Sequence, residues 1–463
     1  MRLLILTLLS SALAACGGAS PKPVDDSCDA ANDCTDPALP YCVEGACHAC
    51  DGASACTPDA PRCSPADLVC ADCVGDIDCS GYPSMPRCNS TDGSCVGCVE
   101  SSQCANPTPV CDPDTQACRG CSSDDDCASA ACDRTTGTCI GEAAVLYASA
   151  NGPAAALCTK AAPCSFAKAI MTVDATHAHI KLAGGLYTGI EHRIAGATTM
   201  AIHGLGATLT TELIIEDGAT VRIDDLTIDS RLNCLTSTTA AAIPTVVLDH
   251  VTLDTLEVRP CILEIYDSRF TPGPTEQPIR ARADVAQRRS TVLLERTLIA
   301  GGEGLCFEGS TYDIRNSVIA NVTDAAGASA FVCMNSPQAP GSTVQFTTFY
   351  NAPVVCVNGV IPSLAISSSI IFSDRSTADA AACNQATFHY TLVSPQAAAL
   401  PGANNLLGMD PMFAEPAAAN LHLLPGSPAI DAADPAAPAS VDFDGLSRLG
   451  RGDMGAFEYL TPQ

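Results

Sequence analysis

The chain has 463 residues, with 51 acidic against 23 basic side chains and a net charge of −28 at pH 7. This excess of negative charge argues against nucleic acids and anionic lipid surfaces as partners, because phosphate contacts need clustered lysine and arginine. The 29 cysteines raise the question of whether they hold a metal or each other.

The N-terminal sequence MRLLILTLLSSALAACGG has the order of an export signal, with one arginine, a short apolar run and then small residues. The run is too short to span a bilayer as a helix. Residues 13–16, Leu-Ala-Ala-Cys, resemble the bacterial lipobox, which implies cleavage before Cys16 and acylation of that cysteine. We therefore expect residues 1–15 to be a lipoprotein signal peptide and residues 16–27 a tether. The mature chain would be exported and lipid-anchored, at the outer membrane or cell surface.

Twenty cysteines between residues 28 and 139 repeat in fours, and five residues always separate the first cysteine of a unit from the second. The five units start at Cys28, Cys50, Cys73, Cys98 and Cys121. Because thiols oxidise outside the cytosol, we predict that each unit closes its disulfides internally and that residues 28–140 form a stiff stalk. The Asp-, Asn- or Gly-containing turns between the last two cysteines of a unit predict a hairpin closed by a bridge. A series of all-thiolate zinc sites is the alternative.

From about Glu142 the chain changes to short bursts of Ala, Thr, Ile, Val and Leu, separated by Gly, Asp and Asn, which is typical of many short strands. Seven segments share apolar residues at positions i and i+5: 223–228, 248–253, 265–270, 294–299, 314–319, 344–349 and 366–371. Because side chains alternate along a strand, an inward-facing pair at this spacing needs a bend between two strands. Short polar residues that suit such a bend occupy position i+2 in four segments: Asp225, His250, Asp267 and Asn316.

With these coils, the chain resembles the right-handed parallel β-helix, or pectin-lyase-like, superfamily over residues 145–459. Residues 145–170 and the following IKLAGGLYTG resemble the start of that fold, with a strand, a capping helix and a first coil. Residues 404–434 and 442–459 resemble the closing segment of surface β-helix proteins of the choice-of-anchor Q type.

The resemblance implies an all-β chain, in which residues 141–463 form a right-handed parallel β-helix solenoid with a closing motif at 441–459, preceded by the small disulfide-rich module. Neighbouring coils of such a solenoid lie about 4.8 Å apart, within the reach of a disulfide. Three cysteine pairs are separated by 27 positions, about one coil, and are expected to bridge adjacent coils: Cys234–Cys261, Cys306–Cys333 and Cys356–Cys383. Cys158 and Cys164 are left to close a loop before the capping helix.

Many members of the superfamily cleave acidic polysaccharides with aspartates that hold calcium beside an arginine base, or with aspartates that activate water. Stacking the aligned coils places Asp224 over Asp249 and Asp229 over Asp254. Four carboxylates this close would bind a cation such as calcium or take up a proton. Arg269 is the nearest aligned arginine. We interpret the four aspartates as solvated strand positions of a very acidic protein, because an isolated surface cluster is weak support for catalysis.

Three further motifs carry charge. Asp124, Asp125 and Asp126 lack the spacing of a calcium-binding EF-hand loop and are interpreted as a solvated acidic turn. The basic stretch RARADVAQRR, residues 280–289, is interpreted as a projecting, solvated loop, with contact to an anionic glycan as the alternative. The tripeptide Arg451-Gly452-Asp453 matches an integrin-binding motif, but it lies within the closing segment, where Gly and Asp have structural roles.

Together these features predict a monomeric, membrane-anchored surface lipoprotein that displays a β-helix for adhesion or for binding to glycan or envelope, without catalysis and without a cofactor. A polysaccharide lyase or glycoside hydrolase on the same scaffold is the alternative, and a passive spacer is a third. The fold alone does not choose among them.

Overall fold

We analysed the protein in a computed structural model. The structure describes residues 41–44, 46–49, 62–63, 70–283, 288–308, 310–322, 332–335, 341–355, 364–376, 378–383, 386–437 and 440–460. The expected signal peptide and tether, with Cys16, lie outside this range, as do Cys28 and Cys50.

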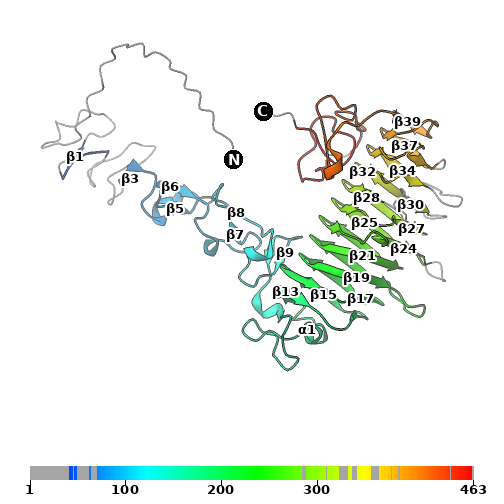
Figure 1. Ribbon diagram of the computed structural model, residues 1–463. Helices are drawn as coiled ribbons and strands as arrows, with labels where there is room; N and C mark the ends of the chain where they lie inside the picture. The colour runs from blue at the N-terminus through cyan, green and yellow to red at the C-terminus, as the bar shows by residue number, and fades with distance from the viewer. Residues whose placement is uncertain are drawn as a thin grey trace, which may run out of the picture. The chain divides into compact units, whose positions relative to one another are not determined.

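The C-terminal part of the chain is a solenoid of parallel strands, in which each coil pairs with the coil before and after it (Figure 1). Three ladders of strands run along it, and we call them faces 1, 2 and 3. The predicted fold class, an all-β right-handed parallel β-helix preceded by a small disulfide-rich module, is confirmed.

Face 1 is a 12-stranded sheet in the order β11 (Val145–Ala148), β12 (His179–Leu182), β15 (Thr199–His203), β18 (Thr220–Asp224), β20 (Thr245–Asp249), β22 (Ile262–Tyr266), β25 (Thr291–Glu295), β28 (Thr311–Arg315), β31 (Ser342–Gln345), β34 (Leu364–Ser367), β37 (Thr387–His389) and β39 (Gly402–Ala403). Face 2 stacks β13 (Gly185–Tyr187), β16 (Ala207–Leu209), β19 (Thr227–Leu235), β21 (Thr252–Arg259), β23 (Arg269–Phe270), β26 (Leu298–Ala300), β29 (Val318–Ala320), β32 (Thr348–Tyr350), β35 (Ile370–Phe372), β38 (Leu392–Ser394) and β40 (Leu406–Leu407). Face 3 stacks β14 (His192–Ile194), β17 (Leu213–Glu216), the second halves of β19 and β21, β24 (Ile279–Arg282), β27 (Cys306–Glu308), β30 (Val332–Asn335), β33 (Val354–Val355) and β36 (Ala381–Ala382). Because β19 and β21 run through both faces, faces 2 and 3 join into one 18-stranded sheet.

A left-handed residue turns the chain from face 1 to face 2 in successive coils. Ile223 is the last inward-facing residue of β18, and Ile228 is an inward-facing residue of β19. Between them, Asp225 has a φ of 56°. The same conformation recurs at His250, Asp267, Arg296, Asn316, Phe346, Ser368, Tyr390 and Asn404. Asp225 N–H donates to the carbonyl of Asp249 in the next coil at 3.1 Å, so the bend is bonded from coil to coil. The bend predicted from the i and i+5 pattern is confirmed, although large residues also occupy the corner.

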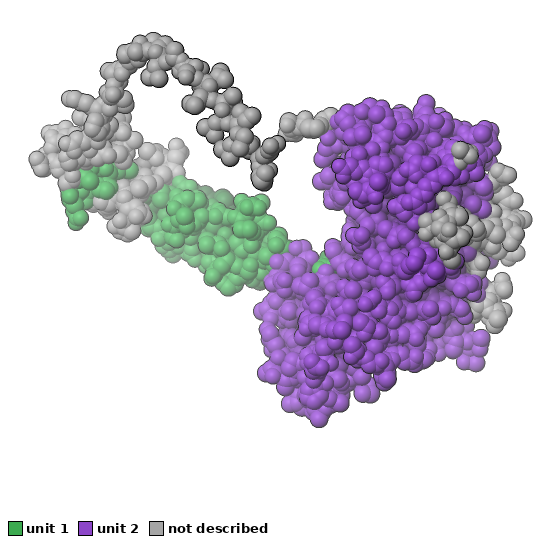
Figure 2. Space-filling view, viewed as in Figure 1, with its two compact units in different colours: residues 1–121, 134–138 green, residues 122–133, 139–463 purple. Residues whose placement is uncertain are grey.

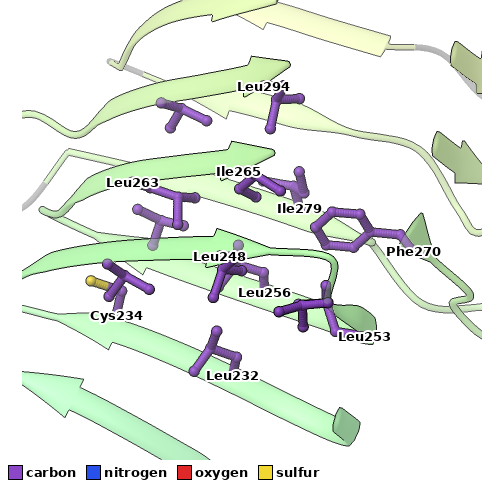
Figure 3. Close-up of a cluster of buried hydrophobic side chains, with 14 of the residues drawn as sticks. Leu232, Cys234, Leu248, Leu253, Leu256, Leu263, Ile265, Phe270, Ile279 and Leu294 are labelled. Carbon is purple, nitrogen blue, oxygen red and sulfur yellow. The ribbon is translucent and has the colours of Figure 1, made fainter. Parts of the chain in front are cut away.

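The interior of the β-helix is lined by apolar side chains in the coils that the structure describes. Figure 3 shows side chains from successive coils stacked in the core, among them Leu248 and Leu263 of neighbouring face 1 strands and Phe270 of face 2. All three are fully buried. Because each coil buries its apolar side against the next, stability is spread over nearest-neighbour contacts rather than one central core.

The first coil is closed by the predicted capping elements. The helix α1 (Phe166–Thr172) begins after Ser165, whose hydroxyl accepts from Lys168 N–H, and it buries Phe166. The loop closed by the Cys158–Cys164 disulfide bonds to the outer edge of β11, where Cys164 N–H donates to Tyr147 O at 3.0 Å. This loop covers a strand edge that would otherwise be open to pairing with another chain.

Two of the four cysteine pairs expected in the β-helix are described completely: Cys158–Cys164 and Cys234–Cys261, the second with its Cα atoms 5.9 Å apart. Cys306 and Cys383 are also in disulfides. Their expected partners have side chains outside the described residues, and Cys306 is the strand partner of Cys333 in adjacent coils.

The cysteine-rich module consists of short two-stranded antiparallel hairpins: β1 (Tyr41–Val43) with β2 (Ala46–His48), β3 (Arg62–Cys63) with β4 (Cys70–Ala71), β5 (Arg87–Asn89) with β6 (Ser94–Val96), β7 (Val110–Cys111) with β8 (Cys118–Arg119), and β9 (Cys132–Asp133) with β10 (Thr138–Cys139). Short 3-10 helices occur in the last three repeats and at the junction: η2 (Asp76–Gly81), η3 (Ser101–Gln103), η4 (Asp124–Asp126) and η5 (Glu142–Ala144). The hairpins form at the predicted turns.

The bridges do not close the hairpins on themselves, so that part of the prediction is wrong. Cys88 and Cys95 face each other across β5 and β6, yet Cys88 bonds Cys73 and Cys95 bonds Cys79. The next unit repeats this order of first to third and second to fourth cysteine, with Cys98–Cys111 and Cys104–Cys118. Bridges to the preceding segment close longer loops than a hairpin bridge would, and so restrict the unfolded chain more.

The chain divides into two compact units, and the division falls inside the fifth repeat (Figure 2). Residues 122–133 and everything from Cys139 onward belong with the β-helix, whereas residues up to Cys121, with 134–138, form the other unit. The sequence predicted a stalk over residues 28–140. Most of its last repeat is thus part of the β-helix unit. Within the described residues, no helix is long and apolar enough to cross a membrane.

Candidate functional site

Asp224 and Asp249 lie side by side at the ends of β18 and β20, as the coil alignment predicts. Arg222 bonds both carboxylates, with Nε 2.8 Å from Asp224 Oδ1 and Nη2 2.5 Å from Asp249 Oδ2. Asp224 is 1% exposed and Asp249 8% exposed. The interpretation of these two residues as solvated positions is therefore wrong. They belong to a buried ion-pair network, in which an arginine balances the two charges.

The arginine expected near Asp224 and Asp249 lies on a different face of the β-helix. Arg269 lies on β23 of face 2, exposed, opposite Thr252. Arg222 was missed, although its position two residues before Asp224 places both side chains on the same side of one strand. The alternation of side chains along β18 was the signal that could have identified it.

The fifth repeat completes the network from the other side. Asp124, in η4, accepts from Lys181 Nζ at 2.9 Å, and His203 Nδ1 lies 3.2 Å from Asp124 Oδ1 and 3.6 Å from Asp224 Oδ2. Lys181, His203 and Asp224 are consecutive partners along face 1. Burial alone would raise the pKa of Asp124, but the hydrogen bond and charge of His203 and the charge of Lys181 lower it to about 2.

This contact corrects the interpretation of residues 124–126 as a solvated turn. Asp124 is buried. Asp126 accepts from the N–H groups of Ser122 and Ser123, which caps the short helix η4, and Asp125 is exposed. Only one of the three carboxylates is solvated as predicted.

One group of metal-ligating type other than cysteine has its atoms close together among the described residues: Asp249, His250 and Asp267, within 4.8 Å of one another. His250 sits at a corner, where the sequence predicted a turn residue. Asp249 already bonds Arg222, and both oxygens of Asp267 accept from Arg296, at 2.6 and 2.7 Å. The carboxylates that a cation would need as ligands are thus already bonded to arginines.

The second predicted pair, Asp229 and Asp254, lies on β19 and β21, away from the face that carries Asp224. Burial raises the pKa of Asp254, and the charge of Asp229 and a hydrogen bond with it raise that pKa further. The structure therefore brings each pair together, as the alignment predicts, but it divides the four carboxylates between two faces.

A charged groove lies beside this second pair. It consists of two adjoining cavities, of about 290 and 420 Å³, over the outer surface of β19, β21 and β24. The smaller cavity is lined by Glu212, Ser230, Arg231, Asp254, Thr255 and Glu276. The larger is lined by Arg231, Thr255, Leu256, Glu257, Thr275, Glu276, Gln277, Arg280 and Glu303. We refer to these residues together as the charged groove.

The strands explain why the groove forms here. Pairing of β19 with β21 shifts register between Ile228 and Arg231, where the two long strands pass from face 2 to face 3. The segment between β23 and β24 then supplies Glu276, whose Oε2 accepts from Gly273 N–H at 2.9 Å. Nothing in the local sequence marks this place, because its residues come from several coils.

The basic stretch 280–289 begins in a strand, which corrects the prediction of a projecting loop for its first residues. Arg280 lies on β24 and faces the charged groove. Arg288 donates to the carbonyls of Ser237 and Ala240 at 2.7 and 2.9 Å. Residues 284–287 lie outside the described range.

The closing segment folds back onto the last coils through β41 (Phe413–Glu415), η6 (Pro416–Ala418) and β42 (Asn420–Leu423) (Figure 1). Arg451 lies over the ring of Tyr390, and Asp453, 2% exposed, accepts from the N–H groups of Asp431 and Tyr459. Burial raises the pKa of Asp453 to about 6. The Arg-Gly-Asp tripeptide is thus part of the fold rather than an exposed adhesive loop.

Comparisons with known proteins add little about activity. Residues 76–145 match the model of a family of unknown function (DUF8331), which covers most of the last three cysteine-rich repeats and the start of β11. No curated protein matches the chain. Among solved structures, the crystal structure of pectate lyase Pel9A is similar, with 12% sequence identity over 69% of this chain and 97% of that chain, and a TM-score of 0.39. At this identity and score the likeness bears on neither substrate nor mechanism.

Proposed function

We propose that the chain is an exported lipoprotein, anchored through Cys16, whose cysteine-rich repeats carry a β-helix at the cell surface, and that the charged groove of this β-helix binds polysaccharide without cleaving it. The observation that carries the proposal is the groove itself. It is open, polar and charged, and it lies on a scaffold that repeats along one axis, which suits an extended ligand.

The volume of the groove supports a saccharide ligand. Its cavities of about 290 and 420 Å³ fall in or near the range of about 300–1,000 Å³ typical of small-molecule sites. Hydroxyls of Thr255 and Thr275 and the amide of Gln277 line it beside the charged groups. These side chains donate and accept hydrogen bonds, which matches the hydroxyl-rich surface of a sugar.

The role of Asp224 and Asp249 supports binding rather than catalysis. A polysaccharide-cleaving site needs carboxylates that reach the substrate, and these two are buried and bonded to Arg222. Their geometry explains cohesion of the β-helix and keeps these two carboxylates away from an open surface.

Binding can be tested with the full chain carrying Cys16→Ser, which removes the expected acylation site. On an array of bacterial polysaccharides, we expect binding that is lost in Arg231→Ala/Arg280→Ala. The matched control is Arg193→Ala, an exposed arginine on β14 of the same face that bonds Glu191 and Glu216. Equal loss in the control, or no polysaccharide bound by the unaltered groove, would remove the proposal.

The anchor is tested separately. In a bacterial host, the unaltered chain should partition with membranes and take up labelled lipid, whereas Cys16→Ser should appear in soluble fractions. Membrane partitioning that persists in the serine variant would contradict a lipid anchor at this residue.

Polysaccharide cleavage is the second candidate, and the Asp229–Asp254 pair is the observation that favours it. Asp254 is a carboxyl group whose pKa is raised by burial and by a neighbouring carboxylate, and such a group is suited to general acid catalysis. If the chain is an enzyme, acidic polysaccharides should yield shorter products in its presence, and Asp254→Asn should abolish them. If the polymer remains intact after prolonged incubation, the cleavage hypothesis is wrong and binding without cleavage stands.

A further inference from the structure

The charged groove has two halves of different character. Arg231, Thr255 and Glu276 line both cavities and mark where the halves meet. The larger cavity adds Arg280, so it holds two guanidinium groups beside Glu257, Glu276 and Glu303, and Glu257 is paired with Arg259. The smaller cavity adds only acidic and neutral side chains. A ligand that spans the groove therefore meets two guanidinium groups in the larger half, and beyond Arg231 only carboxylates and neutral groups in the smaller half.

The two arginines of the larger half have no protein partner among the residues that the structure describes. Within the described chain, Arg231 and Arg280 make no side-chain hydrogen bond or ion pair. Two other arginines of the β-helix are instead paired, Arg259 with Glu257 and Arg296 with Asp267. The planar donor forks of Arg231 and Arg280 match the oxygens of a carboxylate, sulfate or phosphate group.

The smaller half offers the complementary chemistry. Asp254, Glu212 and Glu276 converge there, and Asp229 lies against Asp254. Burial raises the pKa of Asp254, and the neighbouring charge of Asp229 raises it further, so the negatively charged form of this carboxyl group is disfavoured in the groove. An ammonium group has three donors and one positive charge, so it would satisfy several of these oxygens and relieve the repulsion.

From these two halves we infer that the charged groove selects zwitterionic saccharides, in which a sugar with a free amino group neighbours a sugar with an acidic group. This inference rests on the proposed polysaccharide binding and specifies its ligand. The amino group enters the half with Asp254 and Glu212, and the acidic group meets Arg231 and Arg280. Two adjoining cavities of about 290 and 420 Å³ provide a place for each of the two sugars.

The test uses four oligosaccharides of equal length that separate the two charges. N-deacetylated heparosan alternates glucosamine and glucuronate and carries both charges, while heparosan itself carries only the acid. Chitosan oligosaccharides carry only amino groups, and N-acetylchitooligosaccharides carry neither. By calorimetry on the Cys16→Ser chain, we expect N-deacetylated heparosan to bind at least about tenfold more tightly than any of the other three.

Charge-neutralising variants assign each half. Arg280→Gln should reduce affinity for N-deacetylated heparosan about tenfold and leave chitosan binding unchanged. Glu212→Gln should do the reverse, weakening chitosan and leaving heparosan unchanged. Arg193→Gln is the control, with all four affinities unaltered, and a thermal midpoint within a degree or two of the parent confirms folding of each variant.

The outcomes separate the inference from the function beneath it. If heparosan or chitosan binds as tightly as the zwitterionic oligosaccharide, the inference is wrong and polysaccharide binding stands. If none of the four binds, and the polysaccharide array is also blank, both fall. If the preference appears but Arg280→Gln and Glu212→Gln leave it intact, the charged groove is not the site.

Discussion

The cysteine-rich repeats and the β-helix are both built by repetition, but different forces hold them. Between residues 70 and 121, the buried apolar side chains other than cysteine are Ala71, Val96 and Val110, and two disulfides cross each of the units starting at Cys73 and Cys98. The β-helix instead buries a continuous stack of Leu, Ile, Val and Phe. Covalent links substitute for a core where a unit is too small to build one.

The fifth repeat belongs to both regions. It keeps the cysteine pattern, with Cys127 bonded to Cys139, yet its Asp124 lies in the ion-pair network of the β-helix. Tyr147 of β11 also donates its hydroxyl to Ser129 O, at 3.1 Å. The fifth repeat, which has the disulfides of the cysteine-rich module, thus covers the first coils of the β-helix, which are stabilised by an apolar core.

Reduction should have the largest effect, and only on one region. With dithiothreitol under native conditions, we expect residues 70–121 to lose protection in hydrogen exchange, because each bridge contributes about 2–4 kcal/mol to units with little core. The β-helix should stay protected, since its apolar stack remains and Cys234 and Cys261 are buried. Repeats that keep their protection after reduction, or that contain stoichiometric zinc, would contradict the disulfide interpretation.

A cavity in the apolar core should destabilise the β-helix and leave the cysteine-rich repeats unaffected. Phe270→Ala removes a fully buried ring and should lower the free energy of unfolding of the β-helix by about 3–5 kcal/mol. Ile262→Ala, on β22 but 39% exposed, is the control and should cost far less. Denaturant unfolding followed by circular dichroism measures both. Similar losses in the two variants would mean that the coil alignment is wrong.

Asp124→Asn tests the junction of the two regions. Removing the carboxylate leaves Lys181 without its partner in a buried ion pair, and we expect a loss of about 3 kcal/mol, against almost none for the exposed neighbour Asp125→Asn. Because the pKa of Asp124 is lowered to about 2 in the folded state, its contribution is complete above the unfolded value of 3.8 and disappears as the pH falls toward 2.

The pH dependence provides the check on that junction. Thermal midpoints measured from pH 5 to pH 2 should fall more steeply for the parent chain than for Asp124→Asn. Parallel curves would show that Asp124 does not stabilise the contact between the fifth repeat and the first coils.

Features that repeat along the chain could be predicted from the sequence. Contacts between residues far apart in the sequence could not. The apolar i and i+5 pattern predicted the corner at Asp225 because that pattern is local and recurs seven times. The fixed cysteine spacing predicted the units in the same way, but not which cysteine bonds which, since Cys88 can reach either a hairpin neighbour or Cys73.

The candidate site was less predictable for a physical reason. Whether an aspartate is solvated depends on what lies over it, and Asp124 comes 57 positions before its partner Lys181. Arg231 and Arg280 meet in one cavity only because β19 and β24 lie near each other on face 3. Charge and composition describe a very acidic chain, and they give no indication of where two unpaired arginines would converge.

The smallest effect on stability is expected where a carboxylate serves a ligand rather than the fold. Asp254→Asn should change the free energy of unfolding by no more than about 0.5 kcal/mol, because this partly exposed group contributes repulsion and one weak bond to Thr271. The binding of chitosan oligosaccharides should change more. In the parent chain, Asp254 takes up a proton at a higher pH than an ordinary aspartate, so affinity for an ammonium group should fall as the pH drops through that raised pKa. In Asp254→Asn this part of the pH dependence should be absent, and calorimetry between pH 7 and pH 4 compares the two chains. A large loss of stability in Asp254→Asn would place this residue with Asp224 and Asp124, as part of the structure of the β-helix rather than of a binding groove.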